Sequence, residues 1–303
     1  MKKERSAVSS QRSVKALARN PDSLPLRLKA ASTQSLTTGH RPPPTVLIIG
    51  HRGAAAVAPE NTLVSFERAL LDGADGIEFD VRLARDGVPV VIHDSTLRRT
   101  ALRNGRVASF SSTELSEMDA GSWFNLRHPV KAHSLYAEAR IPSLAAVFAS
   151  LQNSDTLLYV EMKCGMRDRS KLAAEVVKLV DAHGIASRVR VESFDLAAIT
   201  EVKRLDADLR TTALFDRRLT HPAPSARKMI ERAIRCGAEE IALHHTLATL
   251  RTVAEATQRG LETVVWTADN PAWVARAVKL GVRAIITNDP ARLIEKRRLP
   301  DGQ

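Results

Sequence analysis

Acidic residues interrupt two apolar stretches of the sequence. Within residues 73–83, GADGIEFDVRL, Glu78 and Asp80 alternate with apolar residues, and Glu161 and Lys163 close another apolar run. Alternate residues of a strand share one face, so each pair is expected to point the same way. Burying two carboxylates side by side is costly unless a cation neutralises them. The pattern therefore predicts a cation near these acids.

Three such carboxylates, Glu78, Asp80 and Glu161, predict a metal site with oxygen ligands, of the kind that suits Mg²⁺ or Ca²⁺. The sequence has no CxxC motif and no paired histidine spacing of the kind that zinc sites use. The alternative is an ion-pair network of the acids with Arg52, Arg82 and Lys163. Asp80 could also support the ligands rather than bind the metal itself.

Two histidines lie near the same strand ends. His51 follows VLIIG and His93 follows VVI. A lone histidine beside an apolar run is more often structural, but two with pKa values near neutrality can accept and donate protons on opposite sides of one reacting atom. Arg52 offers a planar fork of donors and Lys163 a point charge, which are typical of phosphate binding. The reacting atom is therefore expected to be phosphorus.

The elements that must position these residues alternate regularly. Eight short apolar runs are separated by helical patterns, which indicates repeated βα units around a parallel sheet. The runs cover residues 46–50, 76–80, 157–162, 189–193, 209–214, 240–244, 262–267 and 283–287. Eight units predict an α/β fold of the (β/α)8 TIM-barrel type. Functional residues of such barrels lie at the C-terminal ends of the strands, where the acids and histidines fall.

Two segments break the alternation. Asp86-Gly87 lies between apolar runs and predicts a hairpin after the second run. Residues 101–140 have weak periodicity and several aromatic residues, so they are expected to form a small inserted cap. Helices are expected elsewhere at 63–71, 171–182 and 247–258, among others.

Charge is concentrated at the N-terminus. Residues 1–44 carry nine basic and two acidic residues, so +7 of the formal net charge of +11 lies there. We expect a disordered basic tail, and no nucleic-acid groove in the rest of the chain. Two cysteines and no long apolar window favour a cytoplasmic protein without a transmembrane segment. The oligomeric state is left open.

An ordered set of motifs resembles the glycerophosphodiester phosphodiesterase family. The matching stretches include GHRG (50–53), APENT (58–62), GADGIEFDV (73–81), DGVPVVIHD (86–94), LRRT (97–100), VEMK (160–163), ESFD (192–195) and VVWTADNP (264–271). The chain departs from the family pattern at Ala84-Arg85 and at Arg283, where relatives often have an acid. The pair His244-His245 is not part of the pattern.

The resemblance implies a barrel of the phospholipase C-like phosphodiesterase type over residues 45–298. It implies metal-dependent hydrolysis of a glycerophosphodiester, such as glycerophosphocholine or glycerophosphoethanolamine, to sn-glycerol 3-phosphate and an alcohol. Its site residues match this chain as follows: His51 and His93 as acid and base, Arg52 and Lys163 on the phosphate, Glu78, Asp80 and Glu161 on Mg²⁺ or Ca²⁺, and Trp266 against the glycerol carbons.

Other functions are compatible with the same residues. A lysophospholipase D would use them with an added apolar slot for an acyl chain. A phosphate-binding protein without catalysis and a nucleic-acid binder acting through the basic tail are further alternatives. The attacking oxygen could come from water or from the glycerol 2-hydroxyl.

Overall fold

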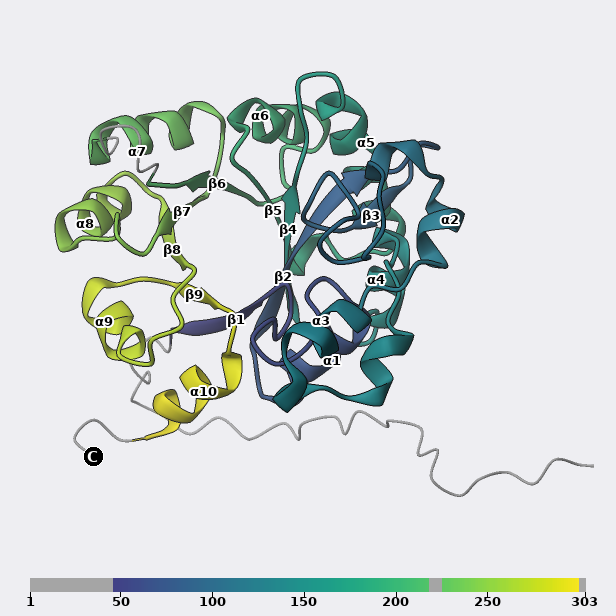
Figure 1. Cartoon of the computed structure of the whole chain (residues 1–303). Helices are drawn as coiled ribbons and strands as arrows, with labels where there is room; N and C mark the ends of the chain where they lie inside the picture. The colour runs from purple at the N-terminus through teal and green to yellow at the C-terminus, as the bar shows by residue number, and fades with distance from the viewer. Residues whose placement is uncertain (1–45, 218–224, 300–303) are drawn as a thin grey trace, which may run out of the picture. The chain divides into compact units, whose positions relative to one another are not determined.

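A closed ring of eight parallel strands forms the centre of the computed structural model, which describes residues 46–217 and 225–299 (Figure 1). The ring runs β1-β9-β8-β7-β6-β5-β4-β2, and β2 pairs with β1 to close it. Its strands are β1 (Leu47–His51), β2 (Gly76–Leu83), β4 (Leu157–Met162), β5 (Val189–Ser193), β6 (Thr211–Phe215), β7 (Glu240–His244), β8 (Glu262–Trp266) and β9 (Ala284–Thr287). The predicted (β/α)8 barrel is confirmed.

Helices surround this ring in Figure 1. They are α1 (Leu63–Leu71), α4 (Leu144–Ser150), α5 (Arg169–Ala182), α6 (Leu196–Leu205), α7 (Ala226–Arg235), α8 (Leu250–Gln258), α9 (Trp273–Leu280) and α10 (Pro290–Arg298). The predicted start of α8 at residue 247 is wrong by three residues. Thr249 caps this helix, because its side chain accepts a hydrogen bond from the Thr252 backbone.

Alternation along the strands separates two environments. Ile77, Phe79 and Val81 of β2 belong to the core between the strands and the helices. The intervening Glu78 and Asp80 therefore face the barrel interior. Farther down, apolar side chains such as Ile49, Tyr159 and Val264 fill that interior.

A charged network closes the lower part of the barrel, toward the N-terminal ends of the strands. Glu240 is fully buried and pairs with Arg190 at 3.2 Å. Arg283, one of the departures from the family pattern, lies 2.9 Å from Glu262 and 3.6 Å from Glu240. The arginine thus has two acidic partners within this network.

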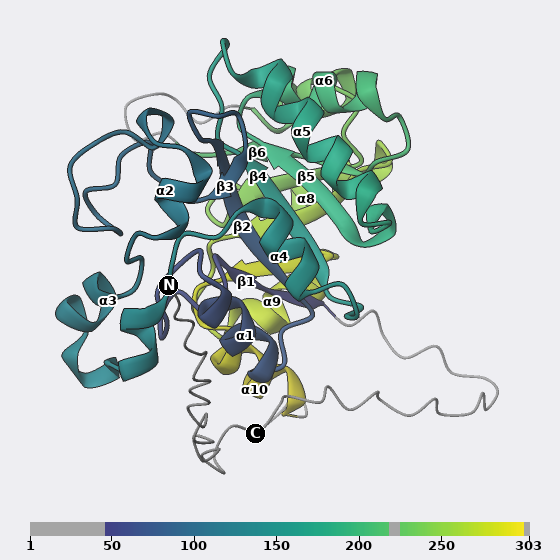
Figure 2. The same cartoon turned by 90° about the vertical axis from the view of Figure 1, so that its right-hand side faces the viewer.

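The predicted hairpin is also confirmed: β3 (Pro89–Val91) pairs antiparallel with β2. The chain then forms η1 (Val107–Ser109), α2 (Ser112–Ser116), α3 (Ser122–Arg127), η2 (Pro129–Lys131) and η3 (Ser134–Glu138). Figure 2 shows α2 and α3 to one side of the barrel strands. Leu97, Val107 and Leu115 belong to a small hydrophobic cluster of this region.

The basic segment 1–44 lies outside the described residues, so its expected disorder stays a prediction. Among the residues that the structure does describe, no helix has the length and hydropathy that crossing a membrane requires.

Candidate active site

The turn that follows β1 brings Arg52 to the mouth of the barrel. Arg52 and Gly53 adopt left-handed backbone angles, with φ of 51° and 85°. A Cβ atom on Gly53 would lie 2.6 Å from the Ser65 backbone, so only glycine fits this turn. The turn also points the Arg52 backbone N–H at Glu78 Oε2, 3.0 Å away. The GHRG motif therefore links β1 directly to an acid of β2.

Glu78, Asp80 and Glu161, here called the acid cluster, are buried together at this mouth. Their exposed fractions are 2%, 0% and 6%, and one carboxylate oxygen from each lies within 4.8 Å of the others. Lys163 Nζ is 3.1 Å from Asp80 Oδ1 and 2.6 Å from Glu161 Oε1. Arg52 Nε is 3.0 Å from Asp80 Oδ2, which also accepts a hydrogen bond from the Asn61 amide.

These contacts leave the cluster short of positive charge. Burial and the Asp80 charge raise the pKa of Glu161 to about 7, and burial with Asp80 and Glu161 raises the pKa of Glu78. Burial alone would raise the pKa of Asp80 as well, but Arg52 and Lys163 lower it. Glu78 Oε1 is buried and has no hydrogen-bond partner among the described residues. A divalent cation would supply the missing charge and a partner for that oxygen, so the cluster fits one.

The two histidines are held through Nδ1 by different partners. His51 Nδ1 lies 2.7 Å from Asn288 Oδ1, and the Asn288 amide donates to Asp269. With its orientation so fixed, Asn288 accepts and His51 Nδ1 donates. Burial and the nearby Arg52 lower the pKa of His51 to about 4. The ring is therefore neutral, and Nε2, 3.8 Å from Glu78 Oε2, is free to accept a proton.

His93 has an acidic partner instead. Its Nδ1 lies 2.6 Å from Asp94 Oδ1. Although burial opposes it, hydrogen bonds from Arg99 and His93 lower the pKa of Asp94 to about 2. Burial, together with the Arg52 and Lys163 charges, lowers the pKa of His93, and Asp80 and Asp94 offset this only in part.

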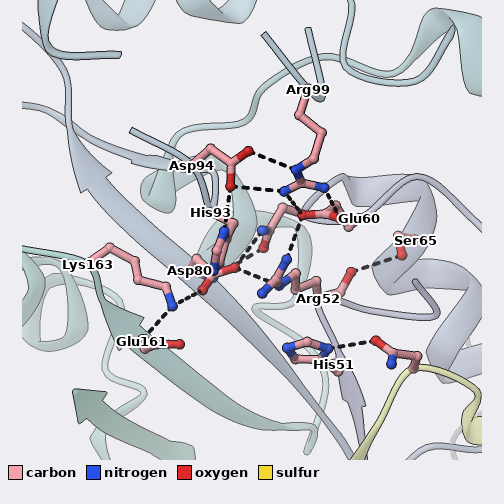
Figure 3. Close-up of polar contacts among 12 residues, drawn as sticks. His51, Arg52, Glu60, Ser65, Asp80, His93, Asp94, Arg99, Glu161 and Lys163 are labelled. Atoms are coloured by element: carbon pink, nitrogen blue, oxygen red, sulfur yellow. Dashed lines mark hydrogen bonds and ion pairs between the residues drawn. The ribbon is translucent and has the colours of Figure 1, made fainter. Parts of the chain in front are cut away.

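A chain of ion pairs connects the two sides of the site (Figure 3). Arg99 donates to Asp94 and to both oxygens of Glu60, and Glu60 also accepts from Arg52 at 2.8 Å. Arg52, which pairs with Asp80, is thereby linked through Glu60 and Arg99 to Asp94, the partner of His93. Arg82 is not part of an ion-pair network with the acids, because it donates to the backbone carbonyls of His93 and Lys163.

A cavity of about 240 Å³, here called the barrel-mouth pocket, lies among these groups. Its lining includes charged and polar residues, namely His51, Arg52, Glu78, His93, Glu161, Lys163, Glu192, Asp216 and Thr267. It also includes the apolar side chains of Phe194, Leu214, Trp266 and Ile286. The Phe194 and Trp266 rings meet edge to face at 5.3 Å. A phosphate with a short carbon chain would therefore find charged, polar and apolar side chains in this pocket.

A larger groove of about 650 Å³ is bordered by α1, α2 and α4, and no residue of the acid cluster and neither His51 nor His93 lines it. The pair His244-His245 lies outside the lining of both cavities. The His244 ring packs edge to face on Trp266.

The structure brings all eight predicted site residues to one mouth, with Asp80 behind the lining of the pocket. Sequence reasoning gave no role to Glu60, Asp94, Arg99 or Asn288. The first three lie inside the matching stretches APENT, DGVPVVIHD and LRRT, and Asn288 lies inside another matching stretch, GVRAIITNDP (281–290). A motif does not reveal which side chains pair across it.

Fold and site together define a class: a barrel enzyme whose mouth carries acidic residues, two histidines and the basic side chains typical of phosphate binding. The profile of the Glycerophosphoryl diester phosphodiesterase family matches residues 51–292. The chain belongs to this family, and the predicted family resemblance is confirmed.

Individual relatives agree with this assignment. A glycerophosphodiester phosphodiesterase of Caldanaerobacter subterraneus is 33% identical over 250 residues, which cover 82% of this chain and 96% of that protein. One from Bacillus subtilis is 29% identical and covers 82% and 85% of the two chains. The solved structure of a glycerophosphodiester phosphodiesterase from Agrobacterium tumefaciens is 29% identical, with a TM-score of 0.66 and coverage of 82% and 99%.

Proposed function

We propose that this enzyme hydrolyses glycerophosphodiesters, such as glycerophosphocholine or glycerophosphoethanolamine, to sn-glycerol 3-phosphate and an alcohol. One observation carries the proposal. The acid cluster, in which Glu78 Oε1 has no partner among the described residues, shares one pocket with two histidines whose Nδ1 atoms are both held by other residues. Family membership and the names of the relatives support the same reaction.

Glu78, Asp80 and Glu161 would hold the divalent cation, Mg²⁺ or Ca²⁺. When bound, such an ion polarises a non-bridging phosphate oxygen and neutralises charge that develops there. Arg52 and Lys163 hold the other non-bridging oxygen. Each keeps its side chain in place through an ion pair with Asp80. These fixed charges stabilise the transition state without reorganising.

The partners of the histidines support one assignment of the proton transfers. His51, which is neutral and hydrogen-bonded to an amide, takes the proton of the attacking oxygen on Nε2. The phosphorus–oxygen bond to the alcohol breaks as His93, supported by the Asp94 carboxylate, gives its proton to the departing oxygen. The attacking oxygen belongs to water or to the glycerol 2-hydroxyl, which gives a cyclic phosphate that water then opens.

Trp266 provides an apolar wall against the glycerol carbons, supported by its contact with Phe194.

The lysophospholipid alternative needs an apolar slot that continues from the pocket. The 650 Å³ groove shares no lining residue with the barrel-mouth pocket, so this alternative gains no support.

We place the enzyme in the cytoplasm because Cys164 and Cys236 are both free thiols.

The test is release of sn-glycerol 3-phosphate from glycerophosphocholine by protein treated with EDTA and then resupplied with Mg²⁺ or Ca²⁺. We expect activity that the metal restores and that His51→Ala lacks. No release from any glycerophosphodiester by the folded, metal-loaded protein would refute the proposal. Reaction in ¹⁸O-labelled water, with a search for a cyclic phosphate, separates the two routes of attack.

A further inference from the structure

Glu192 is a buried carboxyl group that the proposed mechanism does not use. It lies on β5, directly beside Glu161 in the strand register, and only 1% of its surface is exposed. Glu192 Oε2 is fully buried and has no hydrogen-bond partner among residues 46–217 and 225–299. A buried carboxyl without a partner destabilises the fold, so packing gives no reason for an acid here.

Three nearby side chains that could donate a hydrogen bond to Glu192 contact other acids instead. Arg190, two residues earlier on the same face of β5, pairs with Glu240. Thr212, the neighbour in register on β6, donates its hydroxyl to Glu240 as well. Lys163 contacts Asp80 and Glu161. Glu192 also stands outside the group of ligand atoms that lie within 4.8 Å of one another, so a metal held by the acid cluster does not account for it.

Its place in the barrel-mouth pocket indicates what it could bind. β5 lies between β4, which carries Glu161, and β6, which carries the pocket residue Leu214. A substrate whose phosphate meets Arg52 and Lys163 and whose carbons follow Leu214 and Trp266 would pass this carboxyl group. Glu192 lines this pocket, and a hydroxyl on those carbons is a donor from which its carboxyl group can accept a hydrogen bond.

We infer that Glu192 is a specificity-determining residue that accepts a hydrogen bond from a free hydroxyl of the glycerol half of the substrate. The inference rests on the proposed function. A site built to bond a hydroxyl strongly disfavours the analogue that lacks it, because the buried acceptor is then left unpaired. Glu192 would thus select glycerol diesters over diesters of simple alcohols.

The test compares glycerophosphocholine with two analogues, each lacking one of the two free glycerol hydroxyls. Wild-type protein should cleave at least one analogue with a kcat/KM lower by about 10- to 100-fold, the loss expected for one hydrogen bond to a charged group. Glu192→Met, of similar volume, should lose about as much on glycerophosphocholine and show no further penalty on that analogue. Glu192→Gln, which keeps an acceptor oxygen, should stay within about fivefold of wild type on glycerophosphocholine.

Leu214→Met is the matched control, because it alters the same pocket without removing a polar group and should change all three substrates alike. If Glu192→Met does not fold, Glu192→Ala gives the same comparison. If both analogues keep their full wild-type penalties in a folded Glu192→Met variant, the inference is overturned while the proposed function stands. A Kd for Mg²⁺ raised tenfold or more in both Glu192→Met and Glu192→Gln would also overturn it, since that identifies a metal ligand. A wild-type protein inactive on every glycerophosphodiester would instead refute the proposed function.

Discussion

His93 Nδ1 lies 2.6 Å from Asp94 Oδ1, and Asp94 is the only one of the two histidine partners that carries a charge at neutral pH. An ionised carboxylate can only accept, so the ring donates from Nδ1 and turns Nε2 away from Asp94. His51, held by the Asn288 amide, lacks this support for a positive charge. The difference predicts which histidine keeps its proton.

Asp94→Asn should lower kcat by about 10- to 100-fold, part of the roughly 10²- to 10⁴-fold that a positioned general acid contributes. Removing the carboxylate lowers the pKa of His93, so its protonated form is lost at lower pH. The alkaline limb of kcat/KM should therefore move to lower pH while the acidic limb stays. A pH–rate profile checks this, and an unmoved alkaline limb would contradict the role of His93 as the acid.

The two histidines should also differ in their dependence on the leaving group. His51→Ala and His93→Ala should each lose about 10²- to 10⁴-fold on glycerophosphocholine. A p-nitrophenolate departs without protonation, so His93→Ala should lose at least tenfold less on glyceryl p-nitrophenyl phosphate than on glycerophosphocholine. His51→Ala should lose equally on both. The reverse pattern would exchange the two roles.

Metal binding should release protons in a pH-dependent way. Glu161, with a pKa of about 7, holds a proton at pH 6 that a cation must displace. Burial, Asp80 and Glu161 also raise the pKa of Glu78, which acts in the same direction. Calorimetric titration with Mg²⁺ or Ca²⁺ in two buffers of different ionisation enthalpy should detect this release at pH 6 and find little at pH 9. Equal proton release at both pH values would contradict these pKa shifts.

Stability without metal should fall as the pH rises through the same range. Glu161 has its pKa raised from 4.5 to about 7 in the folded protein, so the folded state binds more protons between these values. The unfolding free energy then decreases by about 1.4 kcal/mol per pH unit for each such proton. Thermal unfolding at pH 5, 6 and 7 should show that the stability of the protein in EDTA falls with pH more than the stability of the protein with Mg²⁺ or Ca²⁺. The same dependence on pH with and without metal would contradict the prediction.

The sequence was sufficient for the barrel because the strand signal is local: each apolar run is short, and several runs are followed by polar residues at the strand end. It was also sufficient for the acid cluster, since Glu78 and Asp80 share a face of one strand. The contacts of Glu60 with Arg99 and of Asn288 with His51 join residues 39 and 237 positions apart. No periodicity or motif spacing encodes such pairings, because they depend on how the loops fold over the barrel mouth.

Arg283 allows the barrel's stability to be tested apart from its chemistry. Its guanidinium contacts Glu262 and Glu240 at the end of the barrel opposite the acid cluster. Arg283→Asp would place a third carboxylate beside the two of Glu240 and Glu262. We expect it to lower the unfolding free energy by about 1 to 3 kcal/mol and Arg283→Met by less, because the latter adds no negative charge. The kcat of both should stay within about twofold of wild type, since residues at this end of a barrel affect stability rather than catalysis.

Thermal unfolding measures the stability of the two Arg283 variants, and steady-state kinetics measures their kcat. Should Arg283→Asp leave the melting temperature unchanged, the ion pairs with Glu240 and Glu262 contribute nothing to the fold.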